Sequence, residues 1–154
     1  MNIDFKNPPL GLFVYRTETH FDVLDAQWLM HHSRQIRYME RAQQAMFDHI
    51  MGADTFDPWK YPDMNVVVRK LNVDFIQGLR GVRPFMITLR VVQLRASALT
   101  TQIELRSEDG KEVYTKAKRT VCKIGFEKQE PQFWTEDFVE RYTPWVNVGK
   151  KLEL

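Results

Sequence analysis

The chain has 154 residues, the length of one ordinary domain with room for a substantial core. Hydrophobic residues make up 44% and charged residues 27%, the balance of a soluble globular protein, and no apolar run is long enough to span a bilayer. The net charge is only +2, and Cys122 is the single cysteine, which excludes an intrachain disulfide and suits a reducing compartment. Because the first residues lack the pattern of a signal peptide, we expect a cytoplasmic protein with no membrane segment.

The charges are distributed unevenly along the chain. Residues 64–95 carry six basic side chains against one acidic one, whereas residues 1–63 carry six basic and nine acidic. The six basic residues of the first range are Arg69, Lys70, Arg80, Arg83, Arg90 and Arg95. A local basic excess suits a partner that bears phosphate groups, although the solvated face of strands is often basic without any such role. No recognised nucleic-acid-binding motif accompanies it, so nucleic acid is not expected as a partner.

The first predicted elements are one strand and one long helix. Residues 12–24 are rich in β-branched and aromatic residues and follow the breaker NPPLG, which favours a strand. Residues 32–51 repeat apolar side chains at steps of three and four, and Gly52 is suited to end the helix that this spacing predicts. At 1.5 Å per residue the helix would be about 30 Å long, enough to cross a small domain.

The rest of the chain up to residue 124 is predicted to form strands. In residues 97–107 apolar and polar residues alternate, as in a strand with one buried face. The pair Asp109-Gly110 is a strong hairpin signal, and connections this short require antiparallel neighbours. The pattern therefore predicts an α+β fold in which one helix covers a sheet of about five strands, four of them in an antiparallel meander. The four segments are 66–76, 84–94, 97–107 and 111–124.

Residues 127–154 are predicted to be an extension of a domain that spans residues 1–126. Thr135 is suited to cap a short helix through TEDFVERY, because acidic residues follow it in the first turn. Leaving the aromatic side chains of the extension in water would be costly. We therefore expect the extension to pack on the same domain or on a partner subunit.

Asp25 lies where the first predicted strand gives way to the long helix. An aspartate in such a place is commonly a turn or cap residue. A carboxylate beside a helix N-terminus is also a workable hydrolytic site, because the free N–H groups can bind developing negative charge. The amides would polarise a carbonyl while the carboxylate attacks it or activates a water molecule. From the residues alone both interpretations stay open.

The histidines provide no standard metal-binding pattern. His31 and His32 are adjacent and therefore point in different directions from a helix. His20 and Asp22 would share a strand face and could be combined with Asp25 and His32, but this spacing matches no ligand motif. We therefore predict neither a metal nor a cofactor.

The stretch DAQWLMHHSRQIRYMERA, residues 25–42, resembles the signature of the hotdog-fold acyl-CoA thioesterases of the 4-hydroxybenzoyl-CoA thioesterase type. In that signature an aspartate is followed seven positions later by histidine or tyrosine and fifteen positions later by Glu-Arg-Ala. Asp25, His32 and Glu40-Arg41-Ala42 meet these positions without a gap. Three later stretches, VVVRKLNVDFIQGLR, VVQLRASALT and RSEDGKEVYTKAKRTVCKI, are similar to the family's second strand, a strand turn and the closing hairpin. The resemblance covers about residues 12–125.

The resemblance implies a hotdog fold, in which a curved antiparallel sheet wraps one long central helix. It also implies a homodimer formed edge to edge, often paired again into a tetramer, with the active site at the dimer interface. Asp25 would be the nucleophile or general base. The backbone N–H of His32 would polarise the thioester carbonyl, with its imidazole able to assist. Glu40 matches a recurrent glutamate that either takes part in catalysis or anchors the helix.

The implied substrate is an acyl-CoA or an acyl group on a carrier protein. The basic segment would offer a surface for the phosphates of coenzyme A. The residues expected to bind substrate are Trp28, His31, Arg69, Arg95 and Ser97.

The chain departs from the family pattern near the proposed nucleophile. Gln27 and Trp28 stand where glycines are common, and Arg34 and Gln35 replace a small polar residue and a tyrosine. The leading interpretation is an acyl-CoA thioesterase that releases free acid and thiol. A second is a non-hydrolytic hotdog protein that binds acyl thioesters or acts as a scaffold, and a third is a dehydratase or hydratase on the same fold.

Overall fold

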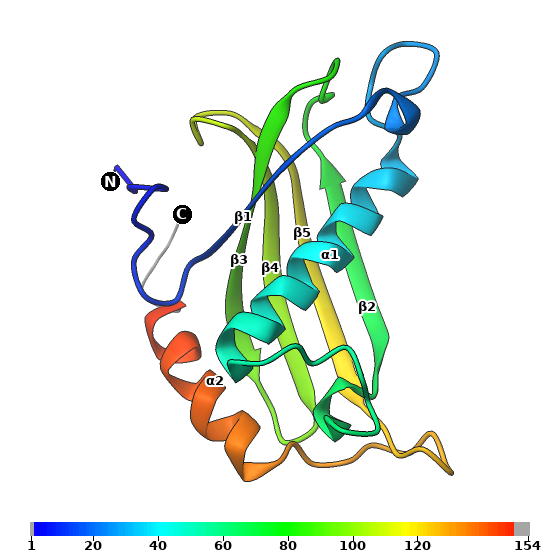
Figure 1. The fold of residues 1–154 in the computed structure, drawn as a ribbon, viewed down its shortest axis with the longest axis vertical. Helices are drawn as coiled ribbons and strands as arrows, with labels where there is room; N and C mark the ends of the chain where they lie inside the picture. Colours follow the sequence, from blue (N-terminus) through cyan, green and yellow to red (C-terminus); the bar gives the residue numbers. More distant parts are fainter. Residues whose placement is uncertain (1, 150–154) are drawn as a thin grey trace.

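A five-stranded antiparallel sheet carries the long helix across one of its faces (Figure 1). The computed structural model describes residues 2–149 and confirms the predicted α+β class. No helix in that range is sufficiently long and apolar to cross a membrane. The strands are β1 Phe13–Glu18, β2 Val66–Phe75, β3 Pro84–Leu94, β4 Ala98–Ser107 and β5 Val113–Lys123. The helices are α1 His32–Met51 and α2 Glu136–Gly149, with two short 3₁₀ helices, η1 Phe21–Val23 and η2 Pro62–Met64.

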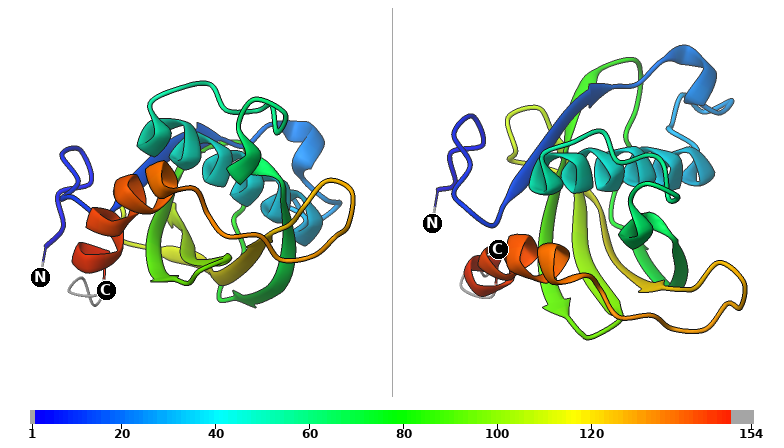
Figure 2. Two further views of the ribbon diagram at one scale, coloured as in Figure 1. Left: turned by 90° about the horizontal axis from the view of Figure 1, so that it is seen from below. Right: turned by 60° about the horizontal axis from the view of Figure 1, so that its bottom comes forward.

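The strand order is β1-β3-β4-β5-β2, so the predicted four-stranded meander is wrong in one respect. β3, β4 and β5 follow one another as predicted, but β2 pairs with β5 and not with β3, its neighbour along the chain. Residues 76–83, which join β2 to β3, instead cross the end of the sheet. β1 and β2 are thereby placed at opposite edges, and the sheet curves around α1 (Figure 2).

The apolar spacing of α1 explains both its bounds and its position. Met39, Ala42, Met46 and Ile50 recur at three- and four-residue steps and are buried against the sheet. Gly52 ends the helix with a φ of 72°, in the left-handed region that a glycine adopts without strain. Burial of this stripe is the main source of stability for the helix.

β1 is shorter than predicted, because the ladder with β3 ends at Glu18. The next residue, Thr19, is fully buried; its N–H donates to the carbonyl of Arg83 and its Oγ1 to the carbonyl of Gly81, at 2.9 and 2.8 Å. These bonds end the strand, and the chain then turns into η1. His20 and Asp22 therefore do not share a strand face, contrary to prediction.

Asp63 connects the C-terminal extension to the sheet. Its carboxylate accepts hydrogen bonds from the N–H and the Oγ1 of Thr135, at 3.0 and 2.6 Å, and from Nζ of Lys123 at 2.8 Å. Asp63 and Lys123 are both buried, so each charge depends on the other. The predicted cap is confirmed, because Thr135 Oγ1 accepts a hydrogen bond from the N–H of Phe138 at 3.2 Å.

The aromatic residues of the extension are divided between core and surface. Trp134 stacks on Phe138, and Phe138 on Tyr142, with ring centroids 4.2 Å apart in each pair. Phe138 and Tyr142 also lie 5.7 and 6.1 Å from the ring of Phe47 on α1. Phe133, in contrast, is 79% exposed. The extension thus adds a third layer of aromatic side chains beside the C-terminal half of α1.

Candidate active site

A tight loop over residues 24–30 joins η1 to α1, and Asp25 organises it. The N–H of Asp25 donates to the carbonyl of Leu29, and the N–H of Trp28 to the carbonyl of Asp25, at 2.8 and 3.0 Å. Oδ1 of Asp25 accepts from the N–H groups of Gln27 and Leu29, at 2.8 and 3.2 Å. No hydrogen bond from the described residues reaches Oδ2, and the residue is exposed. One carboxylate oxygen therefore holds the loop, while the other faces solvent.

Trp28 has a φ of 63° and is the one residue other than glycine with a positive φ within residues 2–149. A side chain in this region costs about 1–2 kcal/mol. Two hydrogen bonds hold the strained loop: Gly81 N–H donates to the carbonyl of Trp28, and Arg80 Nη1 to the carbonyl of Gln27, both at 2.8 Å. A glycine, which the resemblance leads us to expect at this position, would adopt this φ without strain. Here the indole replaces it and is 61% exposed beside Asp25.

The start of α1 carries polar groups at the same end of the sheet as the Asp25 loop. His31 caps the helix, because its Nδ1 accepts from the N–H of Ser33 at 3.3 Å. His32 is the first helical residue, and its N–H has no partner among residues 2–149, as expected at that position. The imidazole of His32 is exposed, 4.2 Å from the ring of His31 and 6.1 Å from the ring of Phe75 at the end of β2. An N–H at a helix N-terminus is suited to bind a carbonyl oxygen that gains negative charge.

Glu40 lies eight residues along α1 from His32, about 12 Å along the helix axis. Its two carboxylate oxygens accept hydrogen bonds from Nε and Nη2 of Arg119 on β5, at 2.8 and 2.7 Å. This bidentate pair fixes α1 to the sheet. The geometry favours the anchoring role for Glu40, and a catalytic role stays a prediction.

The remaining predicted residues lie elsewhere in the chain. Arg69 is exposed on the edge strand β2. Arg95 and Ser97 form the turn between β3 and β4, where the N–H of Arg95 donates to the carbonyl of Ala98 at 2.8 Å. This turn and the Asp25 loop are at opposite ends of the sheet (Figure 1). A single chain therefore brings Asp25, Trp28, His31 and His32 to one end, separate from Arg95 and Ser97.

The basic segment does not form one continuous surface. Arg90 is buried on the sheet face that points away from α1, where its Nη2 donates to Oε1 of Gln102 at 2.8 Å. Burial lowers the pKa of the Arg90 guanidinium. Arg80 is used in the loop contact described above. The basic side chains of this segment that are exposed and make no hydrogen bond within residues 2–149 are Arg69, Lys70, Arg83 and Arg95.

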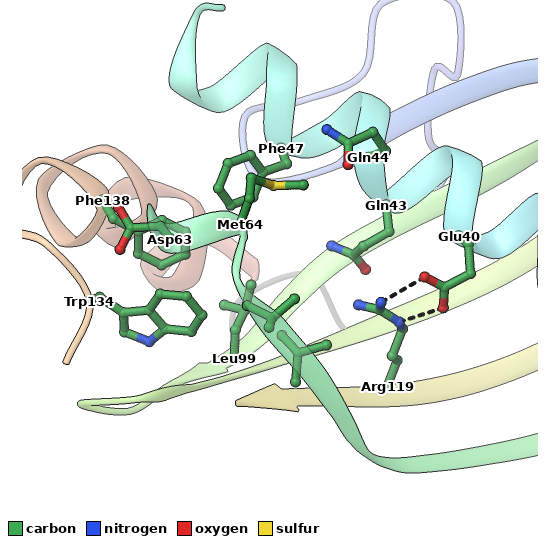
Figure 3. A pocket seen from close by; sticks show the side chains of 12 residues that line it. Glu40, Gln43, Gln44, Phe47, Asp63, Met64, Leu99, Arg119, Trp134 and Phe138 are labelled. Carbon is green, nitrogen blue, oxygen red and sulfur yellow. Dashed lines mark hydrogen bonds and ion pairs between the residues drawn. The ribbon is translucent and has the colours of Figure 1, made fainter. Parts of the chain in front are cut away.

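The structure adds a pocket that sequence reasoning missed (Figure 3). Its volume, with the open space at its mouth included, is about 420 Å³. It lies between α1, η2 with the start of β2, the strands β4 and β5, and α2 with the segment that precedes it. Each element contributes one to four side chains, so no single stretch of sequence marks the pocket. Its lining is Glu40, Gln43, Gln44, Phe47, Asp63, Met64, Val66, Leu99, Arg119, Val121, Trp134 and Phe138. Within residues 2–149, no three His, Cys, Asp or Glu side chains lie close enough to hold a metal ion.

Comparison with known proteins identifies the family. The model of the thioesterase superfamily matches residues 29–114, more than half of the chain. The chain belongs to the thioesterase superfamily, and its fold is the hotdog fold. The match includes His32 and Glu40 but begins after Asp25 and Trp28. No curated protein matches the sequence.

Solved structures share the fold at low sequence identity. A hypothetical protein from Staphylococcus aureus, solved in complex with CoA, is 14% identical with a TM-score of 0.78, over 90% of this chain and 85% of that one. A DHNA-CoA thioesterase from Staphylococcus aureus is 15% identical with a TM-score of 0.77, over 93% and 96%. A thioesterase from Thermus thermophilus, solved with coenzyme A and Zn, is 20% identical with a TM-score of 0.70, over 94% and 98%.

Proposed function

We propose that this protein hydrolyses acyl thioesters of coenzyme A, or of an acyl carrier protein, to the free acid and thiol. The observation that carries the proposal is the arrangement at the start of α1. There, the exposed Asp25 carboxylate has one oxygen, and His32 an N–H, without a hydrogen-bond partner within residues 2–149, and both lie at the same end of the sheet. Membership of the thioesterase superfamily and the CoA bound in similar folds support the choice of substrate class.

In the proposed reaction, the thioester carbonyl accepts a hydrogen bond from the N–H of His32. The helix N-terminus then stabilises the oxyanion that forms when the carbonyl carbon is attacked. Oδ2 of Asp25 takes the proton of an attacking water molecule, or attacks the carbon itself to form an anhydride that water then hydrolyses. In either route the C–S bond breaks, and the sulfur leaves and is protonated to the free thiol. The bonds from Gln27 and Leu29 to Oδ1 keep the carboxylate in one orientation, which reduces the entropy lost on reaching the transition state.

We further propose that a second copy of the chain completes the site. β2 is an edge strand of ten residues, and the exposed side chains along it include the apolar Val68 and Phe75. A long, exposed edge pairs readily with another strand. A two-fold pairing of β2 with its copy would be antiparallel. The end of one β2 beside His32 would then face the end of the second copy that carries Arg95 and Ser97.

The test is release of thiol from a panel of short, long and aromatic acyl-CoAs by wild type and Asp25→Asn. Because the asparagine oxygen still accepts the two N–H bonds, the loop should survive while the charge is lost. We expect a fall in turnover of about a hundredfold or more. The matched control is Asp22→Asn, which removes an exposed carboxylate three residues away and should leave turnover unchanged.

Circular dichroism and size-exclusion chromatography would establish that both variants keep the fold and oligomeric state of wild type. Full activity of Asp25→Asn would contradict the role given to Asp25.

Non-hydrolytic binding of acyl thioesters is the second candidate. It is favoured by the strained, exposed Trp28 beside Asp25, because an indole at this place can close over the carboxylate. A protein of this kind should retain acyl-CoA in equilibrium dialysis without releasing thiol over hours.

A further inference from the structure

The pocket of Figure 3 has an apolar interior. Phe47, Met64, Leu99 and Trp134 form much of its wall, with Phe138 beside Trp134. At one side lies the pair of Glu40 and Arg119, and the Glu40 side chain is 45% exposed, so the pocket reaches the surface there. A mainly apolar cavity with few polar groups is typical of a small-molecule site.

Most polar groups of the pocket already have partners. Glu40 and Arg119 bind each other, and Asp63 accepts three hydrogen bonds from Lys123 and Thr135. Nε2 of Gln44 donates to Oδ1 of Asp48 and to Oγ1 of Thr55, at 2.9 and 3.1 Å. These groups hold the walls in place and have little capacity left for a ligand.

Gln43 is the exception. Its side chain points from α1 into the pocket, between the ion pair and the apolar wall (Figure 3). Gln43 is 8% exposed, and its Oε1 is buried with no hydrogen-bond partner within residues 2–149. A buried acceptor without a partner is unfavourable and needs a reason, such as a ligand that supplies the missing donor.

The pocket and the start of α1 lie along one stripe of the same helix. His32, Glu40, Gln43 and Phe47 are separated by eight, three and four residues, so their side chains leave α1 on nearly the same side. Gln43 is about 16 Å along the helix from His32. β2 runs beside this stripe in the opposite direction, from Val66 at the pocket to Phe75 at His32. The stripe therefore leads from His32, past the Glu40–Arg119 pair, to Gln43.

We propose that this pocket receives the acyl group and that Gln43 selects acyl groups that carry a hydroxyl. The inference rests on the proposed thioesterase function. A hydroxyl can donate to Oε1, and it can also accept from the amide nitrogen if the amide rotates, so it pairs with Gln43 in either orientation. A keto group can only accept, so it pairs with Gln43 in one amide orientation alone, and a charged ammonium would lose its hydration in an otherwise apolar cavity. A plain acyl chain would leave Oε1 unpaired.

The experiment compares matched pairs of acyl-CoAs that differ only in the hydroxyl. The probes are saturated and ω-hydroxylated acyl-CoAs over a ladder of chain lengths that includes chains able to span the roughly 16 Å from His32 to Gln43. We expect wild type to prefer the hydroxylated member of at least one pair by about tenfold in kcat/KM, as one added buried hydrogen bond allows. In Gln43→Leu this preference should disappear, while turnover of the plain acyl-CoA is kept or improved.

Gln43→Leu is expected to fold, because it removes an unpaired buried oxygen and introduces an apolar side chain of similar size. Gln44→Leu is the matched control: the neighbouring amide is already bonded to Asp48 and Thr55, so its loss should not change the ratio between pair members. An unchanged preference in Gln43→Leu, or no preference in wild type for any pair, would overturn the inference.

A second measurement separates this inference from the proposed hydrolysis. Calorimetric titration of the free acids, with and without the ω-hydroxyl, reports on the pocket without any reaction. Selective binding of hydroxy acids that is lost in Gln43→Leu supports the pocket even if no thioester is cleaved. Hydrolysis without discrimination would leave the thioesterase function in place and reject the role of Gln43. Failure of every acid to bind, together with equal hydrolysis within each pair, would also reject it.

Discussion

Two turns at the same end of the sheet are organised by an aspartate, and they differ in the type of residue that adopts a positive φ. In the Asp25 loop, Oδ1 accepts from the N–H of Gln27 at 2.8 Å, and in the β4–β5 hairpin Oδ1 of Asp109 accepts from the N–H of Lys111 at 2.9 Å. Each turn also needs one residue with positive φ. In the hairpin this residue is Gly110, at 78°, whereas in the loop it is Trp28, at 63°.

The difference indicates that the β4–β5 hairpin turn serves the fold alone. In the hairpin, Ser107 Oγ also donates to Asp109 Oδ1, and the ring of Phe5 packs on Gly110. The strain of Trp28 is kept in the loop where a carboxylate oxygen remains open beside a helix N-terminus. Strain retained next to open polar groups is a common property of functional sites.

The largest effect is expected from Gly110→Ala. The new Cβ would combine positive φ with a clash against the Phe5 ring, so we expect a loss of about 2 kcal/mol in the free energy of unfolding. Urea denaturation measures it. Gly81→Ala is the matched control, because Gly81 has a φ of 82° but nothing within 4 Å of the added Cβ. Equal losses in the two variants would mean that Phe5 does not stabilise the hairpin.

A smaller effect of opposite sign is expected from Trp28→Gly. Relief of the strain at positive φ outweighs the extra flexibility of glycine in the unfolded chain, so the free energy of unfolding should rise by about 0.5–1 kcal/mol. Thermal unfolding measures this gain. Trp28→Ala removes the same exposed ring but keeps the strain, so it should give no gain. A gain from alanine equal to that from glycine would show that the indole, and not the backbone, is the source of instability.

The smallest effect concerns pH and Asp109. Hydrogen bonds from Ser107 and from the N–H of Lys111 lower the pKa of the Asp109 carboxyl. Its contribution to stability is therefore complete above the unfolded pKa, about 3.9, and is lost as the pH falls through the lower folded pKa. Asp109→Ala should be less stable than wild type at neutral pH, and the difference should narrow in acid. The midpoints of urea unfolding of both proteins, measured across this pH range, test the prediction. A stability difference that stays constant with pH would contradict it.

Local features of the fold could be predicted well from the sequence. The spacing of Met39, Ala42 and Met46 predicts α1 with its observed bounds, and Asp109-Gly110 predicts the observed hairpin. The partner of β2 could not be predicted, because alternation shows which face of a strand is buried but not which strand lies beside it. β1 was predicted too long, since nothing local indicates that the polar groups of Thr19 bind the carbonyls of residues 81 and 83.

The candidate site could be predicted only in part, for the same reason. Asp25 and His32 are close in sequence, and the structure places both at one end of the sheet. The pocket around Gln43 depends on Trp134, which lies some ninety residues further along the chain and is brought there by the bonds of Thr135 to Asp63. Such long-range contacts leave no periodic signal in one sequence.

The position of Trp134 and Phe138 also has a consequence for biosynthesis. Both follow all five strands of the sheet in the sequence, yet they cover Phe47 and Leu99 and form one wall of the pocket. On the ribosome, α1 and the whole sheet emerge before these residues do. Until residues 134–138 have left the exit tunnel, Phe47 and Leu99 lack this cover, and exposed apolar surface of this kind favours aggregation.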